Sequence, residues 1–408
     1  MEEVIARYQV RSSLPLEEAA KRIAEEESTG TWTHVSTTTK SIEKKYSASV
    51  GGMDEEKGVV EIHYPYADFD LKTGGIPQVL SIVAGNLFGL SALDGVRLLD
   101  VTFPKDFVQQ FDGPNFGVEG IRRMIGTTKD KRPHVGTIIK PKIGLSPKQT
   151  AEVAYEAAIG GVDFIKDDET LVDQSFCALE KRVNAVTEKL DEVKDQTGRT
   201  VLYASNVTST DVIKTAEKAL KAGANCFMID VLTCGFGALQ LLSQKFRKVP
   251  IHVHRTMHAA IDRSMDFGIN FLVFAKLVRL AGGDQLHIGS IIGKMEGAKE
   301  EVFAIEDAIE QSLLKEHATT LDKNWHGIKP TFAVCSGGLH PRLVPELIRL
   351  LGKDIVIQAG GGIHAHPFGT KAGARAMRQA VDAAIKGTPL SKYAQDHVEL
   401  AKALEKWH

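Results

Sequence analysis

From residue 134 onward, short apolar runs alternate with longer amphipathic runs along the chain. The apolar runs are typical of parallel strands that are buried on both faces. They cover residues 134–139, 162–165, 201–205, 226–231, 251–254, 285–288, 332–335 and 355–358. Helical patterns lie between them, for example over 147–158 and 176–196. Eight strands, each followed by a helix over roughly 250 residues, predict a (β/α)8 or TIM barrel.

An open, doubly wound parallel sheet is the alternative architecture. Such a sheet does not usually need eight strands, and its first turn carries a glycine fingerprint that this chain lacks. The pattern therefore favours the barrel. Two more helical patterns, over 371–385 and 390–407, predict helices after the last strand.

The first part of the chain mixes strands and helices without strict alternation. Strands are predicted over 3–10, 59–64 and 96–103, and helices over 16–27 and 77–87. A chain of 408 residues also exceeds what one core usually supports. We therefore expect an α+β domain over 1–115 and a barrel domain over 116–408, with the glycine-containing, basic segment 113–132 as the crossover.

Composition excludes several classes of partner. The net charge of −2 gives no argument for binding nucleic acid or an anionic membrane surface. No apolar run approaches the length of a membrane span, and the acidic start is unlike a signal peptide. The four cysteines have neither zinc-ligand nor disulfide-framework spacing, so we expect reduced thiols in a cytoplasmic protein.

The stretch 161–169 (GVDFIKDDE) ends an apolar run abruptly in a lysine and three acids. Because side chains alternate along a strand, we expect Lys166 and Asp168 to share one face, with Glu169 just past the strand end. Carboxylates such as these suit Mg²⁺. Lys166 could join them only after losing its charge, for instance by reacting with CO₂ to give an anionic carbamate. A salt-bridged strand terminus is the plainer alternative.

Function in such barrels lies at the C-terminal ends of the strands, so the polar residues after each run are the candidates. Six of the eight runs end in such residues. They are Lys140 and Lys142; Lys166, Asp168 and Glu169; His252, His254, Arg255 and His258; His287 and Lys294; Ser336, Gly337 and Gly338; and Gly360, Gly361 and Gly362. We expect them to meet at one rim of the barrel.

The glycines after the last two strands are placed where these barrels commonly bind phosphate through bare backbone N–H groups. Ordinary glycine turns are the alternative for each cluster alone. Arg255 and His287 could hold a second anion across the rim, because arginine matches phosphate geometry. The arrangement suits a bisphosphate. For His252 and His258 a structural role is favoured.

Two lysine features add to the candidate chemistry. We expect Lys140 and Lys142 to share a strand face, either side of Pro141, where repulsion would lower at least one pKa and favour a general acid or base; an exposed basic strand end is the alternative. Lys294 lies in a glycine-bracketed segment, 289–297, that is typical of a closing lid or of an ordinary loop. The stretch 226–237 is interpreted as core. A metal and a base at this rim predict proton abstraction next to a carbonyl in a phosphorylated, sugar-like substrate, with the metal stabilising an enediolate.

Several of these segments together resemble the large subunit of ribulose-1,5-bisphosphate carboxylase/oxygenase (RuBisCO). The segments are 139–145 (IKPKIGL), 161–169, 252–259 (HVHRTMHA), 287–297, 336–338 and 358–366 in the barrel, and 26–33 (EESTGTWT) and 84–89 (AGNLFG) in the first domain. The resemblance covers nearly the whole chain. It is most similar to the archaeal form III enzymes, including the C-terminal 399–407 segment.

The resemblance implies roles for the matching positions. Lys166 would carry the carbamate, bind Mg²⁺ with Asp168 and Glu169, and act as the base for enolisation. Lys140 would transfer protons with Lys142 tuning it, His254 would contact substrate hydroxyls, and Lys294 would steady the carboxylate formed from CO₂. The phosphate contacts would be Arg255, His287 and Ser336 on one side, and Thr31, Trp32, Gly338, Gly360 and Gly361 on the other; Glu26 and Asn86 would complete the site.

The resemblance also implies a homodimer or an assembly of dimers, because the first domain of one subunit covers the barrel of its partner. No small subunit is expected. The implied activity is carboxylation, and oxygenation, of ribulose 1,5-bisphosphate to give 3-phosphoglycerate.

Two alternatives remain. The RuBisCO-like enolases of methionine salvage act on a 2,3-diketo-5-methylthiopentyl-1-phosphate without fixing CO₂. The short start of the chain is closer to those enolases, but they typically lose Lys142 and the lid lysine, which this chain retains. A relative that binds a metabolite without turning it over is the third possibility.

Overall fold

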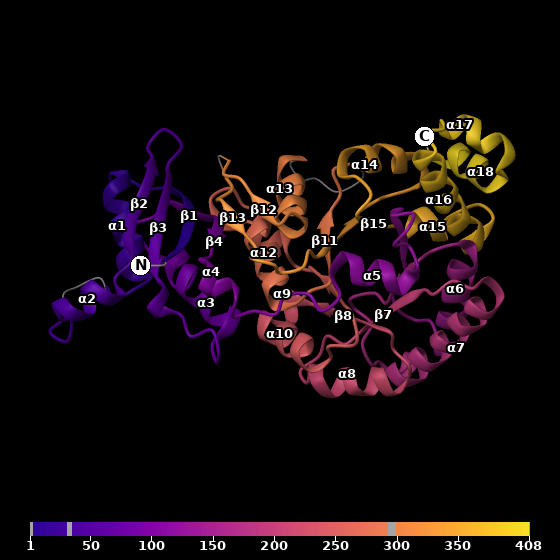
Figure 1. The fold of residues 1–408 in the computed structure, drawn as a ribbon, viewed down its shortest axis with the longest axis horizontal. Coiled ribbons are helices and arrows are strands. Elements are labelled where there is room, and N and C mark those ends of the chain that lie inside the picture. The colour runs from indigo at the N-terminus through magenta and orange to yellow at the C-terminus, as the bar shows by residue number, and fades with distance from the viewer. Residues whose placement is uncertain (1–2, 31–34, 293–298, 318, 408) are drawn as a thin grey trace.

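The computed structural model describes residues 3–30, 35–292, 299–317 and 319–407. A five-stranded sheet, built mainly from the first part of the chain, lies beside a closed barrel of eight parallel strands with helices around it (Figure 1). The predicted fold class, an α+β layer followed by a TIM barrel with C-terminal helices, is therefore confirmed. Among the described helices, none is long and apolar enough to cross a membrane.

The N-terminal sheet has the strand order β10-β4-β1-β3-β2. Its strands are β1 (Glu3–Arg11), β2 (Ser49–Asp54), β3 (Val59–Pro65), β4 (Gly95–Thr102) and β10 (Phe267–Ile269). The first four pair antiparallel, whereas β10 comes from the barrel sequence and runs parallel to β4, with Phe267 opposite Val96. The barrel sequence therefore contributes one strand to the N-terminal sheet. A boundary between two domains near residue 115 stays our proposal.

Two features of this layer differ from the prediction. Helix α3 (Gly75–Val83) ends four residues before the predicted end at Leu87, because the chain turns sharply at Ala84 and Gly85. A Cβ on Gly85 would lie 2.3 Å from the Ser81 carbonyl oxygen, so this close approach needs glycine. Helix α2 (Lys40–Tyr46) and strand β2 were not predicted, since β2 contains a Gly-Gly pair and exposes most of its side chains. The layer also contains α1 (Leu16–Glu26) and α4 (Lys105–Val108).

All eight barrel strands form where the apolar runs predicted them, with ends that differ by one or two residues. They are β5 (His134–Ile138), β6 (Phe164–Lys166), β7 (Leu202–Asn206), β8 (Cys226–Asp230), β9 (Ile251–His254), β11 (Gln285–Gly289), β14 (Phe332–Ser336) and β15 (Ile355–Gln358). Neighbours in the closed order β11-β14-β15-β5-β6-β7-β8-β9 are hydrogen-bonded. Their apolar side chains are buried between the barrel interior and the surrounding helices.

A helix follows each barrel strand, as the alternating pattern predicts. The main helices are α6 (Pro147–Gly160), α7 (Leu179–Thr197), α8 (Val212–Lys221), α10 (Phe236–Lys245), α12 (Phe271–Ala281), α13 (Lys299–Glu310), α14 (Val344–Leu351) and α16 (Gly369–Ile385). Short helices α9 (Val231–Cys234), α11 (Ala259–Asp262) and α15 (Gly361–His364) lie in the connections, and α17 (Leu390–Tyr393) and α18 (Val398–Lys406) pack on α16. The ends of helix α6 are set by its local sequence. Ser146 and Gln149 form a capping box at its start, and Gly161, with a φ of 117°, ends it.

The predicted crossover contains a helix, α5 (Gly117–Ile125), which was not predicted from the sequence. Its apolar face belongs to the same buried cluster as Phe164 and Leu202 in the barrel strands. Asp284 anchors it, accepting hydrogen bonds from the Phe116 and Gly117 N–H groups at 2.6 and 2.9 Å. The helix covers the end of the barrel where the strands begin, so the opposite end is left for chemistry.

Candidate active site

Polar side chains meet in a cavity of about 270 Å³ at the C-terminal ends of the barrel strands. Its walls come from the ends of β5, β6, β9, β11, β14 and β15 and the connections that follow them. The lining residues are Ile138, Lys140, Lys166, Glu169, His254, His287, Ser336, Gly337, Gly338, Gln358, Gly360 and Gly361. The structure therefore brings together ten of the side chains and glycines proposed from sequence, and adds Ile138 and Gln358.

Lys166 is deeply buried at the last position of β6, with a side chain that is 1% exposed. Its amine donates to the Asp167 carbonyl oxygen at 2.9 Å and to Glu169 Oε2 at 3.3 Å. Burial lowers the pKa of Lys166 below its usual value, although the carboxylates of Glu169 and Asp168 act in the opposite direction. Burial thus makes this amine easier to deprotonate than an exposed lysine.

Asp167 determines the path of the chain at this point, a role that we did not predict. Its buried carboxylate accepts hydrogen bonds from the Tyr203 hydroxyl, from the Asn206 N–H at 3.0 Å and from Arg182 Nε at 3.2 Å. The Asn206 side chain in turn donates to the Glu169 carbonyl oxygen at 3.1 Å. These bonds fix the loop after β6, so the two following acids are held at the cavity.

Asp168 lies beyond the strand, not on it, because β6 ends at Lys166. It accepts hydrogen bonds from Lys140 Nζ at 2.9 Å and from the Thr170 hydroxyl at 2.9 Å. Burial raises the pKa of Asp168, but the hydrogen bond and charge of Lys140 outweigh burial and lower it overall. The pKa of Glu169 is likewise lowered: burial raises it, and the charge of Lys166 outweighs burial. Both acids therefore stay ionised near neutral pH.

The two lysines of the 139–145 segment separate in space, which corrects their predicted common strand face. Strand β5 ends at Ile138, so neither lysine lies on a strand. Lys140 lines the cavity, whereas Lys142 is exposed and is not among its lining residues.

His254 is held by a partner in the stretch that we interpreted as core. Asp230, at the end of β8, accepts from His254 Nδ1 at 2.9 Å and from the Thr256 N–H at 2.7 Å. Burial lowers the pKa of His254, although its bond to Asp230 acts in the opposite direction. With Nδ1 donating to Asp230, a neutral His254 turns the lone pair of Nε2 towards Glu169, whose Oε2 is 3.7 Å away. The stretch 226–237 is otherwise buried as predicted, except for a half-buried segment around Cys234.

The glycine loops after β14 and β15 contact each other. Gly337 and Gly338 have φ values of 121° and 71°, which favour glycine, and a Cβ on Gly362 would lie 2.0 Å from the Leu339 carbonyl oxygen. Gly360 lies against Lys140, since a Cβ there would meet the lysine Cε at 3.4 Å. This close packing brings bare backbone to the cavity wall, as an anion-binding loop requires.

Other candidates lie away from this cavity. Arg255 stacks over the Phe271 ring at 4.5 Å and lies beside Gly289, next to the cavity without lining it. Glu26 and Asn86 lie in the N-terminal layer. Thr31, Trp32 and Lys294 lie outside the described residues. Of the two histidines assigned a structural role, His252 is fully buried behind His287, and His258 contacts Asp262 at 2.7 Å.

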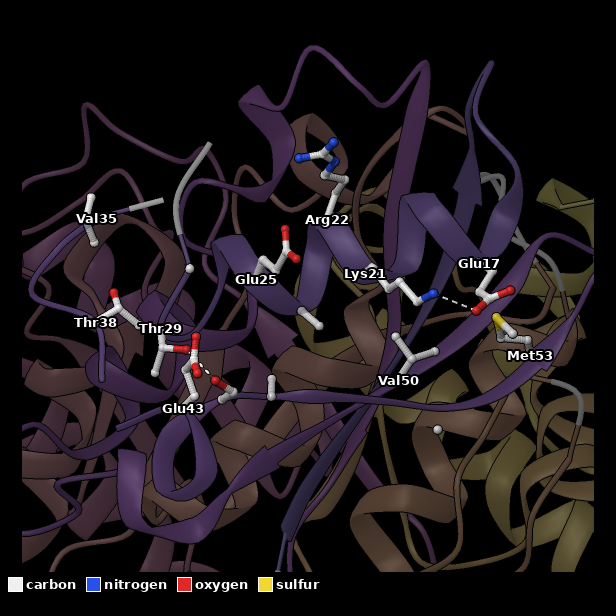
Figure 2. Close-up of a pocket in the computed structure, with 15 residues that line it drawn as sticks. Glu17, Lys21, Arg22, Glu25, Thr29, Val35, Thr38, Glu43, Val50 and Met53 are labelled. Carbon is white, nitrogen blue, oxygen red and sulfur yellow. Dashed lines mark hydrogen bonds and ion pairs between the residues drawn. The ribbon is translucent and has the colours of Figure 1, made fainter. Parts of the chain in front are cut away.

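A larger cavity of about 820 Å³ lies between α1, α2 and β2 (Figure 2). Its charged side chains include Lys21 and Glu17, which pair with each other at 2.6 Å, and Glu25 and Glu43 (Figure 2). Lys21 and Glu17 are both more than half exposed, so their pair resembles an ordinary solvated surface. We assign the chemistry to the smaller cavity, where buried lysine, carboxylates and histidines meet.

A TIM barrel with a lysine–carboxylate cluster and glycine loops at its C-terminal rim defines a class of enzyme that acts on phosphorylated substrates. The chain belongs to the ribulose bisphosphate carboxylase large-chain family. Residues 117–407 match the model of the large-chain catalytic domain, and residues 1–107 match that of the large-chain N-terminal domain.

Individual relatives agree with this assignment over almost the whole chain. The ribulose bisphosphate carboxylase of Methanocaldococcus jannaschii is 45% identical over 403 residues, which cover 96% of this chain and 94% of the relative. That of Pyrococcus abyssi is 43% identical, covering 96% and 90%.

Solved structures of archaeal relatives have the same fold. The dimeric archaeal Rubisco from Hyperthermus butylicus has a TM-score of 0.92 at 40% identity, covering 100% of this chain and 96% of that one. The octameric enzyme from Pyrococcus horikoshii, solved with sulfate, has a TM-score of 0.90 at 41% identity, covering 99% and 93%.

Proposed function

We propose that this protein is a form III ribulose bisphosphate carboxylase, which adds CO₂ to the enediolate of ribulose 1,5-bisphosphate to give 3-phosphoglycerate, and which also reacts with O₂. The observation that carries the proposal is Lys166, a buried amine with a lowered pKa that lines the cavity beside Glu169, while Asp168 is bonded to the cavity residue Lys140. Family membership supports carboxylation over the RuBisCO-like enolase, since the relatives matched over the whole chain are named carboxylases.

Carbamylation of Lys166 is the first step that we propose. The uncharged form of the amine attacks the carbon of CO₂: the N–C bond forms as one C=O π bond opens and leaves the charge on oxygen, and one proton passes from the nitrogen to water. The environment suits this reaction, because burial lowers the pKa of the amine and makes its uncharged form easier to reach. Lys140 and the bonds to Asp167 would keep the neighbouring acids in place while the new anion forms.

The donor set fits a hard divalent cation. Asp168 and Glu169 supply carboxylate oxygens, and a carbamate on Lys166 would add a third anionic oxygen, which is the ligand type that Mg²⁺ prefers. Bound there, Mg²⁺ would polarise the substrate carbonyl and stabilise the charge of the enediolate.

The remaining candidate residues would carry out proton transfer and substrate binding. We propose that the carbamate of Lys166 takes the proton during enolisation, that Lys140 returns a proton, and that Lys142 tunes Lys140. His254, held by Asp230 with Nε2 free for the cavity, would accept a hydrogen bond from a substrate hydroxyl. Lys294 would steady the carboxylate formed from CO₂.

Phosphate binding would use both sides of the rim. We propose Arg255, His287 and Ser336 for one phosphate; Gly337 and Gly338, with Gly360, Gly361, Thr31 and Trp32, would bind the other. Glu26 and Asn86 lie in the N-terminal layer, so a partner subunit would bring its own copies to this barrel. Solved relatives described as dimeric and octameric support a homodimer or an assembly of dimers. The free cysteines support a cytoplasmic location.

The test is carboxylation itself. Purified protein with ribulose 1,5-bisphosphate, Mg²⁺ and labelled CO₂ should yield labelled 3-phosphoglycerate, and absence of label above background would reject the carboxylase. Tautomerisation of the diketo substrate without carboxylation would select the enolase. A Lys294→Ala variant should keep enolisation, measured as proton exchange from the substrate, and lose carboxylation.

A further inference from the structure

The C-terminal end of the chain packs against both of the glycine loops that line the cavity. Trp407, directly after α18, stacks on His340, with ring centroids 5.6 Å apart and ring planes at 9°. Its ring also lies 6.5 Å from that of His366, at an angle of 46°, which is within the range of aromatic pairing. His340 follows the glycines after β14, and His366 follows the glycines after β15. One indole ring therefore pairs with a residue from each loop.

Hydrogen bonds tie the end of α18 to the loop after β14. Arg342 in this loop donates through Nη2 to the Leu404 carbonyl oxygen at 2.9 Å and through Nε to the Trp407 carbonyl oxygen at 2.7 Å. The last carbonyl groups of a helix have no partner within it, so the arginine supplies bonds that this helix end lacks. The stacked ring is thus held by its own backbone as well.

A second set of hydrogen bonds ties α18 to the loop after β15. His366 Nδ1 accepts from the Phe368 N–H at 3.1 Å, so its Nε2 carries the proton and donates to the Glu399 carbonyl oxygen at 2.9 Å. The Lys406 amine donates to the Ala365 carbonyl oxygen. Both ends of α18 are therefore fixed to this loop.

Helix α18 is in turn anchored on α16 (Figure 1). Leu400 and Ala403 are buried. Gln379 of α16 accepts from the Leu400 N–H at 3.0 Å and donates to the Glu399 carboxylate at 2.9 Å. The helix is thus a fixed support for the two loops that contact its end.

We propose that Trp407 is a positioning residue, which fixes the spacing of the two glycine loops and thereby the shape of the anion site that they form. The loops contact each other where Gly362 passes the Leu339 carbonyl group, whereas Trp407 is not among the residues that line the cavity and joins the loops from outside it. An anion bound by N–H groups of both loops loses one set of donors when the spacing changes, because hydrogen bonds weaken steeply with distance and angle. This inference rests on the proposed function for the phosphorylated substrate.

Kinetics test the role of the ring. Trp407→Leu removes the ring, so the KM for ribulose 1,5-bisphosphate should rise about fivefold while kcat changes less than about twofold, the order expected for one aromatic pair. Trp407→Phe keeps a ring and should restore most of the affinity. A fall in kcat at unchanged KM, or a phenylalanine variant no better than the leucine variant, would overturn the proposal.

Tyr393→Leu is the matched control. The Tyr393 ring stacks on His397, a residue of the same C-terminal segment, with centroids 4.0 Å apart and an angle of 13°. Its replacement removes an aromatic–histidine stack of the same kind and should leave KM unchanged. An equal rise in KM for Tyr393→Leu and Trp407→Leu would overturn the proposal, because the effect would then report general packing of the C-terminal helices.

His340→Leu breaks the same stack from the loop side, so it covers the case in which Trp407→Leu does not fold. It should also raise KM about fivefold. The double variant should raise KM no further than Trp407→Leu alone, since both substitutions remove one contact. Additive effects would overturn the proposal.

Binding of inorganic phosphate gives a test that needs no turnover. In equilibrium dialysis with labelled phosphate, the dissociation constant should be about fivefold higher for Trp407→Leu than for the wild type or Tyr393→Leu. Equal binding by Trp407→Leu and the wild type, or no binding by the wild type, would overturn the inference. If phosphate binding depends on Trp407 but no labelled 3-phosphoglycerate forms, the inference holds and the carboxylase function alone is rejected.

Discussion

Glu27, directly after α1, allows a quantitative test of how the N-terminal layer is built. Its buried side chain accepts a hydrogen bond from the Gly85 N–H at 3.0 Å, and the next two backbone N–H groups also face the carboxylate. Burial raises the pKa of Tyr8 in β1 and of Tyr64 in β3, and the nearby charge of Glu27 raises both pKa values further. Its Oε1 atom is buried without a partner among the described groups. The residue therefore joins the end of α1 to the turn that presents Asn86.

Burial raises the pKa of Glu27 from 4.5 to about 7, although the backbone N–H groups that face it act in the opposite direction. A difference of about 2.5 between the folded and unfolded pKa values corresponds to about 3 kcal/mol. Between pH 4.5 and about 7 the folded protein binds more protons than the unfolded chain. The stability contributed by this group is thus full below pH 4.5 and is lost as the pH rises to about 7.

Glu27→Gln keeps the shape and the acceptor for Gly85 but cannot ionise. We expect the free energy of unfolding of the variant to be higher than that of the wild type by about 3 kcal/mol at pH 8. At pH 5 this difference should be only about 1 kcal/mol. Urea denaturation at the two pH values, followed by a probe in the N-terminal layer, measures this difference. Glu25→Gln, at an exposed position on the same helix, should change neither value. A gain of equal size at both pH values would refute the reasoning, because ionisation would not be its cause.

Three further substitutions test the barrel site. Lys166→Ala removes the amine that would carry the carbamate, so carboxylation should become undetectable while circular dichroism stays unchanged; retained activity would contradict the assignment. Asp230→Asn weakens the hydrogen bond that orients His254, so kcat/KM should fall about tenfold or more. A kcat/KM that changes little would contradict this role of Asp230. Tyr203→Phe removes a buried donor from Asp167 and should lower the free energy of unfolding by about 2 kcal/mol in denaturant titrations, whereas unchanged stability would mean that this bond contributes nothing.

The barrel was predictable because each strand is a continuous apolar run with a polar end. That pattern located all eight strands and placed Lys140, Lys166, His254 and Ser336 at one rim. It works because a parallel strand buried on both faces tolerates few polar residues until it leaves the core.

The supporting residues could not be found in the same way. Asp167 and Asp230 bond to groups from neighbouring strands, and which residues face each other across strands depends on the register of the closed barrel. Helix α5 was not predicted within the glycine-containing crossover, although Val118, Ile121 and Ile125 have helical spacing. The three-residue strand β10 is too short to show any period.

Strand β10 also bears on how proteins of this design can be recombined. The barrel sequence supplies the outermost strand of the neighbouring sheet, so the N-terminal layer transplanted alone would keep the pairing of β4 with β1 but leave the outer edge of β4 unpaired. An open edge of that kind invites pairing with other chains. A graft of the N-terminal layer onto a foreign barrel would therefore have to bring Phe267–Ile269 with it, and the natural unit of exchange is discontinuous in sequence.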